Sequence, residues 1–210
     1  MSSRRLENVL GDCRKTLRGC RLFAADAYNW SIAGSKPHIS KSRRDWITET
    51  AFLRAFLAFE MLLEETFILY ATGHQPSRGR PPLRLVQFPS RSVVEEWIVP
   101  EGRSYASWQA GHVQRRAQRF FKDGKPFAAA LAGSQNALDE ARVLRNAVAH
   151  KSSSAQEKFE ALVRAKLGSL PLSITVGGFL LGAVPGVTPP TSFLEYYLGR
   201  LEGVAQQIVP

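Results

Sequence analysis

Three polar side chains suited to phosphodiester chemistry fall within six residues in the second half of the chain. Arg145 and Asn146 are adjacent, and His150 follows them at the end of the segment RNAVAH. A guanidinium can hold a phosphate through two parallel hydrogen bonds. Imidazole is the side chain whose unperturbed pKa lies nearest neutrality, so it can accept or release a proton there. Together the three residues indicate phosphodiester cleavage without a metal ion.

These residues are predicted to lie on one helix that follows Ser134, a residue suited to capping a helix N-terminus. The apolar stripe expected to face the core consists of Leu138, Ala141, Leu144 and Val148. Asn146 and His150 are four residues apart and therefore share a face of the helix. The side chain of Arg145 starts about 100° around the helix but is long enough to reach the same place. A helix fastened to the core can thus present all three groups.

Cleavage of RNA requires a base for the 2′-hydroxyl, an acid for the leaving 5′-oxygen, and charge stabilisation at phosphorus. His150 can serve as the base or the acid. Arg145 can neutralise the developing charge, and Asn146 can orient the imidazole or bind a phosphate oxygen. A symmetric dimer would supply a second copy of each group to a shared cleft. The alternative is structural, because a histidine at a helix C-terminus interacts favourably with the helix dipole. The spacing alone does not decide between them.

The elements that must position this motif are predicted to be helices throughout. Apolar periodicity predicts further helices over residues 3–29, 45–71, 91–98, 104–121, 155–167 and 192–208. The helix over 45–71 has apolar side chains around most of its surface, which is typical of a central helix. We therefore expect an all-α fold, an antiparallel bundle forming a single domain over residues 1–210 and closed by a C-terminal helix. Residues 73–103 are expected to form an insertion of loop and short helix, and residues 168–191 an irregular apolar connection.

The charge of the chain favours an anionic partner. The formal net charge is +10 and the pI is about 10.1, which suits nucleic acid or an acidic protein. Residues 73–90 are rich in Pro, Gly and Arg and are expected to form an exposed basic loop. The candidates for contact with RNA are Arg115, Arg116, Arg119, Arg142 and Lys151. A run of basic residues such as 115–122 is also typical of a merely solvated face.

Glu60 lies inside the apolar arc of the helix over 45–71. It is either a half-exposed residue at the edge of that arc or a charge partner that orients an arginine of the motif helix. Cys13 and Cys20 lie seven residues apart, which on a helix separates them by about 10 Å and excludes a disulfide. We expect both to be small buried hydrophobes. Two cysteines and four scattered histidines provide no metal cluster.

Neither end of the chain carries an apolar segment typical of export or of a membrane anchor. The first residues, MSSRRLENVLGDCRK, are charged and lack the apolar run of a signal peptide. The most apolar late stretch, residues 170–187, is broken repeatedly by Pro and Gly. These features predict a soluble, cytoplasmic protein that does not enter a membrane.

The segment LRNAVAH, preceded by the Phe-rich segment ETAFLRAFLAFEMLLEETF, resembles the HEPN superfamily of α-helical domains. The family signature is an arginine, usually followed by a polar residue, then three to five residues and a histidine. Arg145, Asn146 and His150 match it. RFFKDGKPF and SFLEYYLGRLEGVAQQIV also resemble stretches of bacterial HEPN proteins, so the likeness covers residues 45–72 and 115–208. The loop over 73–90 and the N-terminal helix have no counterpart in it.

The resemblance implies a helical bundle and a homodimer with both copies of the motif in one interface cleft. It also implies metal-independent and cofactor-independent endoribonuclease activity that leaves a 2′,3′-cyclic phosphate and a 5′-hydroxyl. Many members of the family are toxins, antiphage-defence effectors or partners of an antitoxin, whereas others have lost the motif and only bind. Three hypotheses follow: an endoribonuclease, a non-catalytic helical module that binds RNA or an acidic partner, and the HEPN half of a toxin–antitoxin pair.

Overall fold

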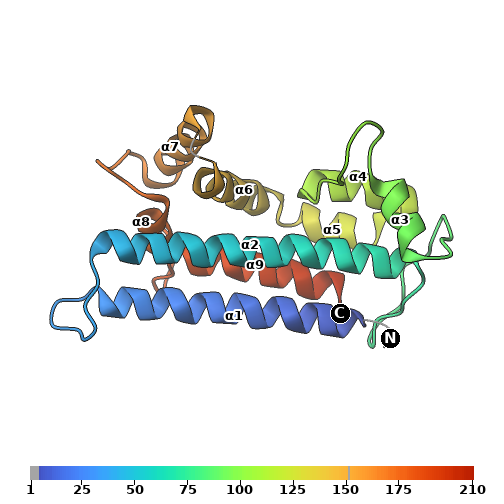
Figure 1. Cartoon of the computed structure of the whole chain (residues 1–210), viewed down its shortest axis with the longest axis horizontal. Helices are drawn as coiled ribbons and strands as arrows, with labels where there is room; N and C mark the ends of the chain where they lie inside the picture. The colour runs from blue at the N-terminus through green and yellow to red at the C-terminus, as the bar shows by residue number, and fades with distance from the viewer. Residues whose placement is uncertain (1–4, 151) are drawn as a thin grey trace. The chain divides into compact units, whose positions relative to one another are not determined.

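The chain folds into helices joined by loops. The computed structural model describes residues 5–150 and 152–210, and within these residues it contains α-helices, one 3₁₀ turn and no β-strand (Figure 1). The elements are α1 (Leu6–Trp30), α2 (Lys41–Ala71), α3 (Arg91–Ile98), α4 (Ala110–Phe120), η1 (Lys122–Gly124), α5 (Phe127–Ala132), α6 (Gln135–Ala149), α7 (Ser153–Leu167), α8 (Val176–Leu181) and α9 (Phe193–Ile208). The prediction of an all-α fold is confirmed.

Most of the predicted helices are present, and two expectations are corrected, one about a helix and one about an irregular connection. The helix expected over 104–121 begins only at Ala110. The residues before it are held in another conformation, because Trp108 packs against Phe67 at 5.9 Å and the Ser107 carbonyl accepts a hydrogen bond from Arg116. The connection over 168–191 contains the short helix α8. Its N-terminus is capped by the hydroxyl of Thr175, which accepts a hydrogen bond from the Gly178 amide.

The protein consists of two compact units, and helices α1, α2 and α9 contribute residues to both. The described residues of unit 1 lie within Met1–Arg14, Ala58–Gln135 and Glu202–Pro210, and unit 2 comprises Lys15–Leu57 and Asn136–Leu201. The motif at 145–150 therefore belongs to unit 2. The basic segment over 73–126 belongs to unit 1.

Unit 1 is organised around the aromatic ring of Phe67. Three phenylalanine rings, those of Phe120, Phe121 and Phe127, lie 5.2–5.3 Å from it. Such aromatic pairs add stabilisation beyond the area that they bury. The loop over 73–90 is anchored beside this core, since Arg84 and Phe121 form an isolated antiparallel bridge. It is thus irregular, as predicted, but held in place by this bridge and by a hydrogen bond from the Ser77 amide to the Glu7 carboxylate of α1.

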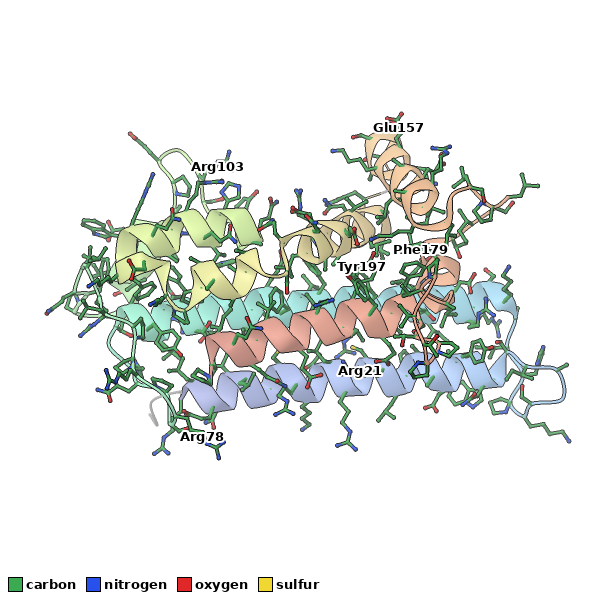
Figure 2. The ribbon with its side chains drawn as sticks, turned by 180° about the vertical axis from the view of Figure 1, so that it is seen from behind. Arg21, Arg78, Arg103, Glu157, Phe179 and Tyr197 are labelled. Carbon is green, nitrogen blue, oxygen red and sulfur yellow. The ribbon has the colours of Figure 1, made fainter. Side chains whose placement is uncertain are left out.

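Unit 2 contains a second aromatic core. Phe179 of α8 stacks on Phe193 of α9 at 4.3 Å, and Phe52 of α2 contacts Tyr197 at 6.4 Å (Figure 2 labels Phe179 and Tyr197). The phenylalanine of α7, Phe159, meets Phe179 edge-on at 6.1 Å. These rings join four helices, and α6 packs its buried stripe within the same unit.

The close packing of α8 on α2 requires glycine at position 177. A Cβ atom at Gly177 would lie 2.2 Å from the backbone oxygen of Asp45 on α2, closer than any real contact. The close approach is fixed by polar bonds: the Thr175 hydroxyl donates to Asp45 at 2.8 Å, and the Gly177 amide donates to Glu49 at 2.9 Å. Arg44 adds a salt bridge to the same buried Asp45 carboxylate.

Candidate active site

The helix that carries the motif, α6, is fastened to unit 2 along one side. Leu138, Ala141 and Leu144 are buried there as predicted, whereas Val148, in the last turn of the helix, is only half-buried. The helix follows Ser134 directly, as expected from the sequence. Most of the predicted stripe therefore anchors the helix, and its C-terminal turn is more open.

A carboxylate on α6 adds a polar anchor to this apolar stripe. Glu140 accepts a hydrogen bond from the buried Tyr197 hydroxyl of α9 at 3.0 Å and pairs with the Lys166 ammonium of α7 at 2.6 Å. Burial, together with the nearby carboxylate, raises the pKa of Tyr197 well above its ordinary value. The tyrosine therefore stays protonated and keeps donating. Sequence reasoning missed this network, because its members are far apart in the chain and each is unremarkable by itself.

Two of the three motif side chains contact each other, those of Arg145 and Asn146. Arg145 donates a hydrogen bond from Nη1 to Oδ1 of Asn146 at 3.1 Å. Arg145 is half-buried and its Nε atom is fully covered, so part of the guanidinium is shielded from solvent. The orientation of the arginine is thus set by both burial and the neighbouring amide.

His150 follows the last residue of α6. Its backbone amide donates to the Asn146 carbonyl at 2.8 Å, which extends the helical hydrogen-bond pattern by one residue. Its side chain is exposed. The histidine is therefore accessible to a substrate and free of apolar core.

Two residues beside the motif were predicted to contact RNA. Arg142 lies one turn before Asn146, and its guanidinium is 3.7 Å from the Asp139 carboxylate. Both side chains are well exposed, so this pair contributes little to stability and can yield to another anion. Lys151 lies outside the described residues, and its role stays a prediction.

Glu60 is half-buried on α2. This agrees with its expected place at the edge of the apolar arc. It belongs to unit 1 and the motif belongs to unit 2. Its pairing with an arginine of α6 stays a prediction.

The basic residues of α4 divide into two kinds. Arg115 and Arg119 are exposed one turn apart. Arg116 instead lies with its guanidinium 4.8 Å from the Trp108 ring centre and 5.8 Å from that of Phe67, and burial lowers its pKa. Arg116 is thus stacked on aromatic rings and holds the segment before α4, and its contact with RNA stays a prediction. That segment carries the exposed Arg103 (Figure 2).

Unit 1 also contains a basic hollow that sequence reasoning did not locate. Its volume is about 500 Å³, and it is formed by the loop at 80–83, the turn at 122–126 and the residues at 207–210. Arg80, Lys122 and Lys125 line it together with a single carboxylate, that of Asp123. The turn needs left-handed backbone at Asp123 (φ 58°) and Gly124 (φ 65°). The K-D-G-K sequence was a signal for such a turn.

The two cysteines of the chain both lie on α1. Cys13 and Cys20 are buried free thiols, as expected. Within residues 5–150 and 152–210, no group of three or more His, Cys, Asp and Glu side chains is arranged to hold a metal ion. In the same residues, no helix is both long and apolar enough to cross a membrane.

Comparison with known proteins provides no further assignment. No protein-family model, curated protein sequence or solved structure matches this chain. Functional inference therefore depends on the chemistry of the side chains themselves. The best-defined arrangement is an anchored arginine bonded to an asparagine, followed by an exposed histidine.

Proposed function

We propose that this protein is a metal-independent endoribonuclease of the HEPN type, that it acts on RNA in the cytoplasm, and that it works as a homodimer. The observation that carries the proposal is the hydrogen bond between Arg145 and Asn146 on a helix fixed by buried Leu144, with exposed His150 directly after it. A catalytic group must be held by a rigid element and still reach its substrate. Arg145 meets the first requirement and His150 the second.

The proposed reaction is attack of a ribose 2′-hydroxyl on the adjacent phosphorus. His150 takes the proton of the 2′-hydroxyl, the 2′-oxygen forms a bond to phosphorus, and the bond to the 5′-oxygen breaks. The second His150 of the proposed homodimer, in its protonated form, gives a proton to the departing 5′-oxygen. Arg145, oriented by Asn146, neutralises the charge on the pentacoordinate phosphate. The products are a 2′,3′-cyclic phosphate and a 5′-hydroxyl.

The dimer is part of the proposal because each chain has one motif histidine. A base and an acid are both needed, and a second copy brings another His150 and Arg145 to the same cleft. Such an enzyme would be damaging to its own cell unless controlled. We therefore propose that it serves as a toxin or an antiphage-defence effector, with an antitoxin or defence-system protein as partner.

The test is cleavage of end-labelled RNA by purified protein in excess EDTA. Wild type is expected to cut, and His150→Ala and Arg145→Ala are expected to lose about 10²–10⁴-fold in rate. His38→Ala is the matched control, since His38 is also exposed but lies in the loop after α1. Equal cleavage by wild type and both motif variants would refute the assignment. So would activity abolished by EDTA.

A second candidate function is RNA binding without cleavage. The observation that favours it is the charge of the segment over 73–126, which holds ten Lys or Arg against four Asp or Glu. Its exposed cations include Arg115, Arg119 and those of the hollow. Phosphate contacts of this kind give binding that weakens steeply with salt. Under this alternative, Arg115→Ala and Arg119→Ala reduce affinity, and His150→Ala changes nothing.

The role beside an antitoxin has its own test. Native purification of the tagged chain from its source cells should recover an unrelated protein that suppresses cleavage. Fully active protein with no such partner would exclude regulation of this kind, while leaving the ribonuclease proposal intact.

A further inference from the structure

The basic hollow of unit 1 has the size and the lining of a small-molecule site. Its volume of about 500 Å³ falls within the range of about 300–1,000 Å³ that is typical of such sites. Most of its wall is apolar, and every residue that lines it belongs to unit 1. The apolar members of the wall are Tyr70, Pro81, Pro82, Leu83, Pro126, Ala129, Ile208 and Pro210.

Hydrogen bonds between segments that are distant in the chain hold this wall in place. The Tyr70 hydroxyl of α2 donates to the Ile208 carbonyl at 2.8 Å. The Lys122 amide donates to the Leu83 carbonyl, also at 2.8 Å. The three segments that form the hollow are thus fastened either to α2 or to one another. A preformed site of this kind lowers the cost of ordering that binding would otherwise impose.

The charges of the lining indicate an anionic ligand. Arg80, Lys122 and Lys125 line the hollow beside one carboxylate, that of Asp123, which leaves a formal excess of two positive charges. The Asp123 carboxylate lies 3.9 Å from the Lys125 ammonium, with 63% and 70% of the two side chains exposed. Such an exposed pair contributes little, so an anion can replace it. A phosphate monoester carries about −1.5 to −2 charges at pH 7, which matches the excess.

We propose that this hollow binds a small phosphate monoester with a compact hydrocarbon body. The three cations are exposed, whereas Tyr70 and Ile208 are buried. The phosphate therefore lies at the exposed cations, where the guanidinium of Arg80 can donate two parallel hydrogen bonds. The hydrocarbon body lies against the apolar wall. A sugar is disfavoured as the body, because its hydroxyls would lose their bonds to water there.

The site goes beyond the proposed function, since the motif at 145–150 belongs to unit 2. RNA could also contact the exposed cations, but it is a poorer occupant of the hollow. Each of its phosphodiesters carries a single charge, and its ribose and phosphate groups are too polar to fill an apolar space. The apolar wall therefore favours the small ligand over RNA.

The test is isothermal titration calorimetry of the full chain with phenyl phosphate at about pH 7.5, where the monoester is mostly dianionic. One site per chain is expected. Phenyl phosphate should bind at least about tenfold more tightly than inorganic phosphate, because the ring is removed from water. Equal affinity for the two would overturn the proposal, since the hollow would then attract a simple anion only. No binding of phenyl phosphate at millimolar concentration would overturn it as well.

Two charge variants change the affinity in opposite directions. Arg80→Gln should weaken binding of phenyl phosphate about tenfold. Arg78→Gln is the matched control and should leave it unchanged, because Arg78 is exposed in the same loop but does not line the hollow (Figure 2). Asp123→Asn should strengthen binding about threefold by removing the carboxylate. Asparagine tolerates the left-handed backbone at this position (φ 58°), and misfolding cannot produce a gain in affinity.

A third variant tests the hydrocarbon body separately from the charge. Ala129 of α5 lines the hollow, so Ala129→Leu should occupy part of it. This change should weaken binding of phenyl phosphate and leave that of inorganic phosphate unchanged. If Arg80→Gln weakens binding of RNA but leaves the affinity for phenyl phosphate as in wild type, the cations serve RNA and the proposal is wrong.

Discussion

Replacement of Gly177 by alanine should destabilise the protein through one steric conflict. The new Cβ would lie 2.2 Å from the backbone oxygen of Asp45, so α8 must move away from α2. Overpacking of this kind costs about 1–3 kcal/mol. The movement also stretches the bond from the Gly177 amide to the Glu49 carboxylate, 2.9 Å in the native protein. A hydrogen bond to a charged group contributes about 1.5–3 kcal/mol.

A smaller effect of opposite sign must be subtracted. Alanine is favoured over glycine inside a helix by about 1 kcal/mol. The expected net loss is therefore about 2–4 kcal/mol in the free energy of unfolding. At about 2–4 °C per kcal/mol for a chain of this size, Tm should fall by roughly 8 °C.

The control is the same substitution at an open position. A Cβ at Gly199, on the exposed side of α9, meets nothing within 4 Å. Gly199→Ala should raise the free energy of unfolding by about 0.5–1 kcal/mol through helix propensity. Urea unfolding followed by circular dichroism measures both variants. If Gly177→Ala is as stable as wild type, the close packing of α8 on α2 is wrong. If the two variants shift in the same direction, steric conflict is not the cause.

Three further predictions concern the supports of the site and the buried polar groups. Glu140→Leu should lower the free energy of unfolding by about 1–3 kcal/mol in urea, because a buried tyrosine hydroxyl loses its acceptor; an unchanged midpoint would count against that network. Arg116→Ala should speed amide hydrogen exchange over residues 101–109, because Arg116 stacks on Trp108 and donates a hydrogen bond to Ser107. Arg115→Ala should leave this exchange unchanged. Equal protection in both variants would show that Arg116 does not hold the segment. Burial raises the pKa of the Cys13 thiol from 9.0 to about 12. The folded protein therefore holds a proton that the unfolded chain releases, and stability falls as pH rises above 9, by up to about 1.4 kcal/mol per pH unit. Cys13→Ala should flatten the profile between pH 9 and 10, and an identical slope would show that another group is responsible.

The sequence predicts those features of the fold that depend on local periodicity. The bounds of α3 match the predicted 91–98, and α7 and α9 end where predicted, because apolar spacing and caps are properties of neighbouring residues. The helix α8 was missed because Val176, Gly177 and Gly178 give no helical signal. Its position depends on Asp45, more than a hundred residues away. The late start of α4 has the same origin, since Trp108 packs against Phe67 of α2, which is distant in the chain.

In the candidate site, too, local contacts could be predicted from the sequence and long-range contacts could not. The contact between Arg145 and Asn146 follows from helical geometry and could be predicted. The anchoring of α6 by Lys166 and Tyr197 could not, because a carboxylate such as Glu140 gives no sign in sequence of its distant partners. The stacking of Arg116 on Trp108 could not be predicted for the same reason. An arginine in a basic run looks like its neighbours until the aromatic ring beneath it is known.

The exposure of His150 bears directly on the proposed chemistry. Charge stabilisation is weak in water and strong in a site from which water is excluded. In a single chain His150 is exposed to solvent, while Arg145 is already half-buried. Water must therefore be excluded from the histidine either by RNA alone or by a second copy of the chain. If the second copy does so, cleavage per chain should fall with dilution in parallel with the dimer. If cleavage per chain is constant from dimer to monomer, RNA closes the site unaided, and the second proton must then move through water rather than through the partner subunit's histidine.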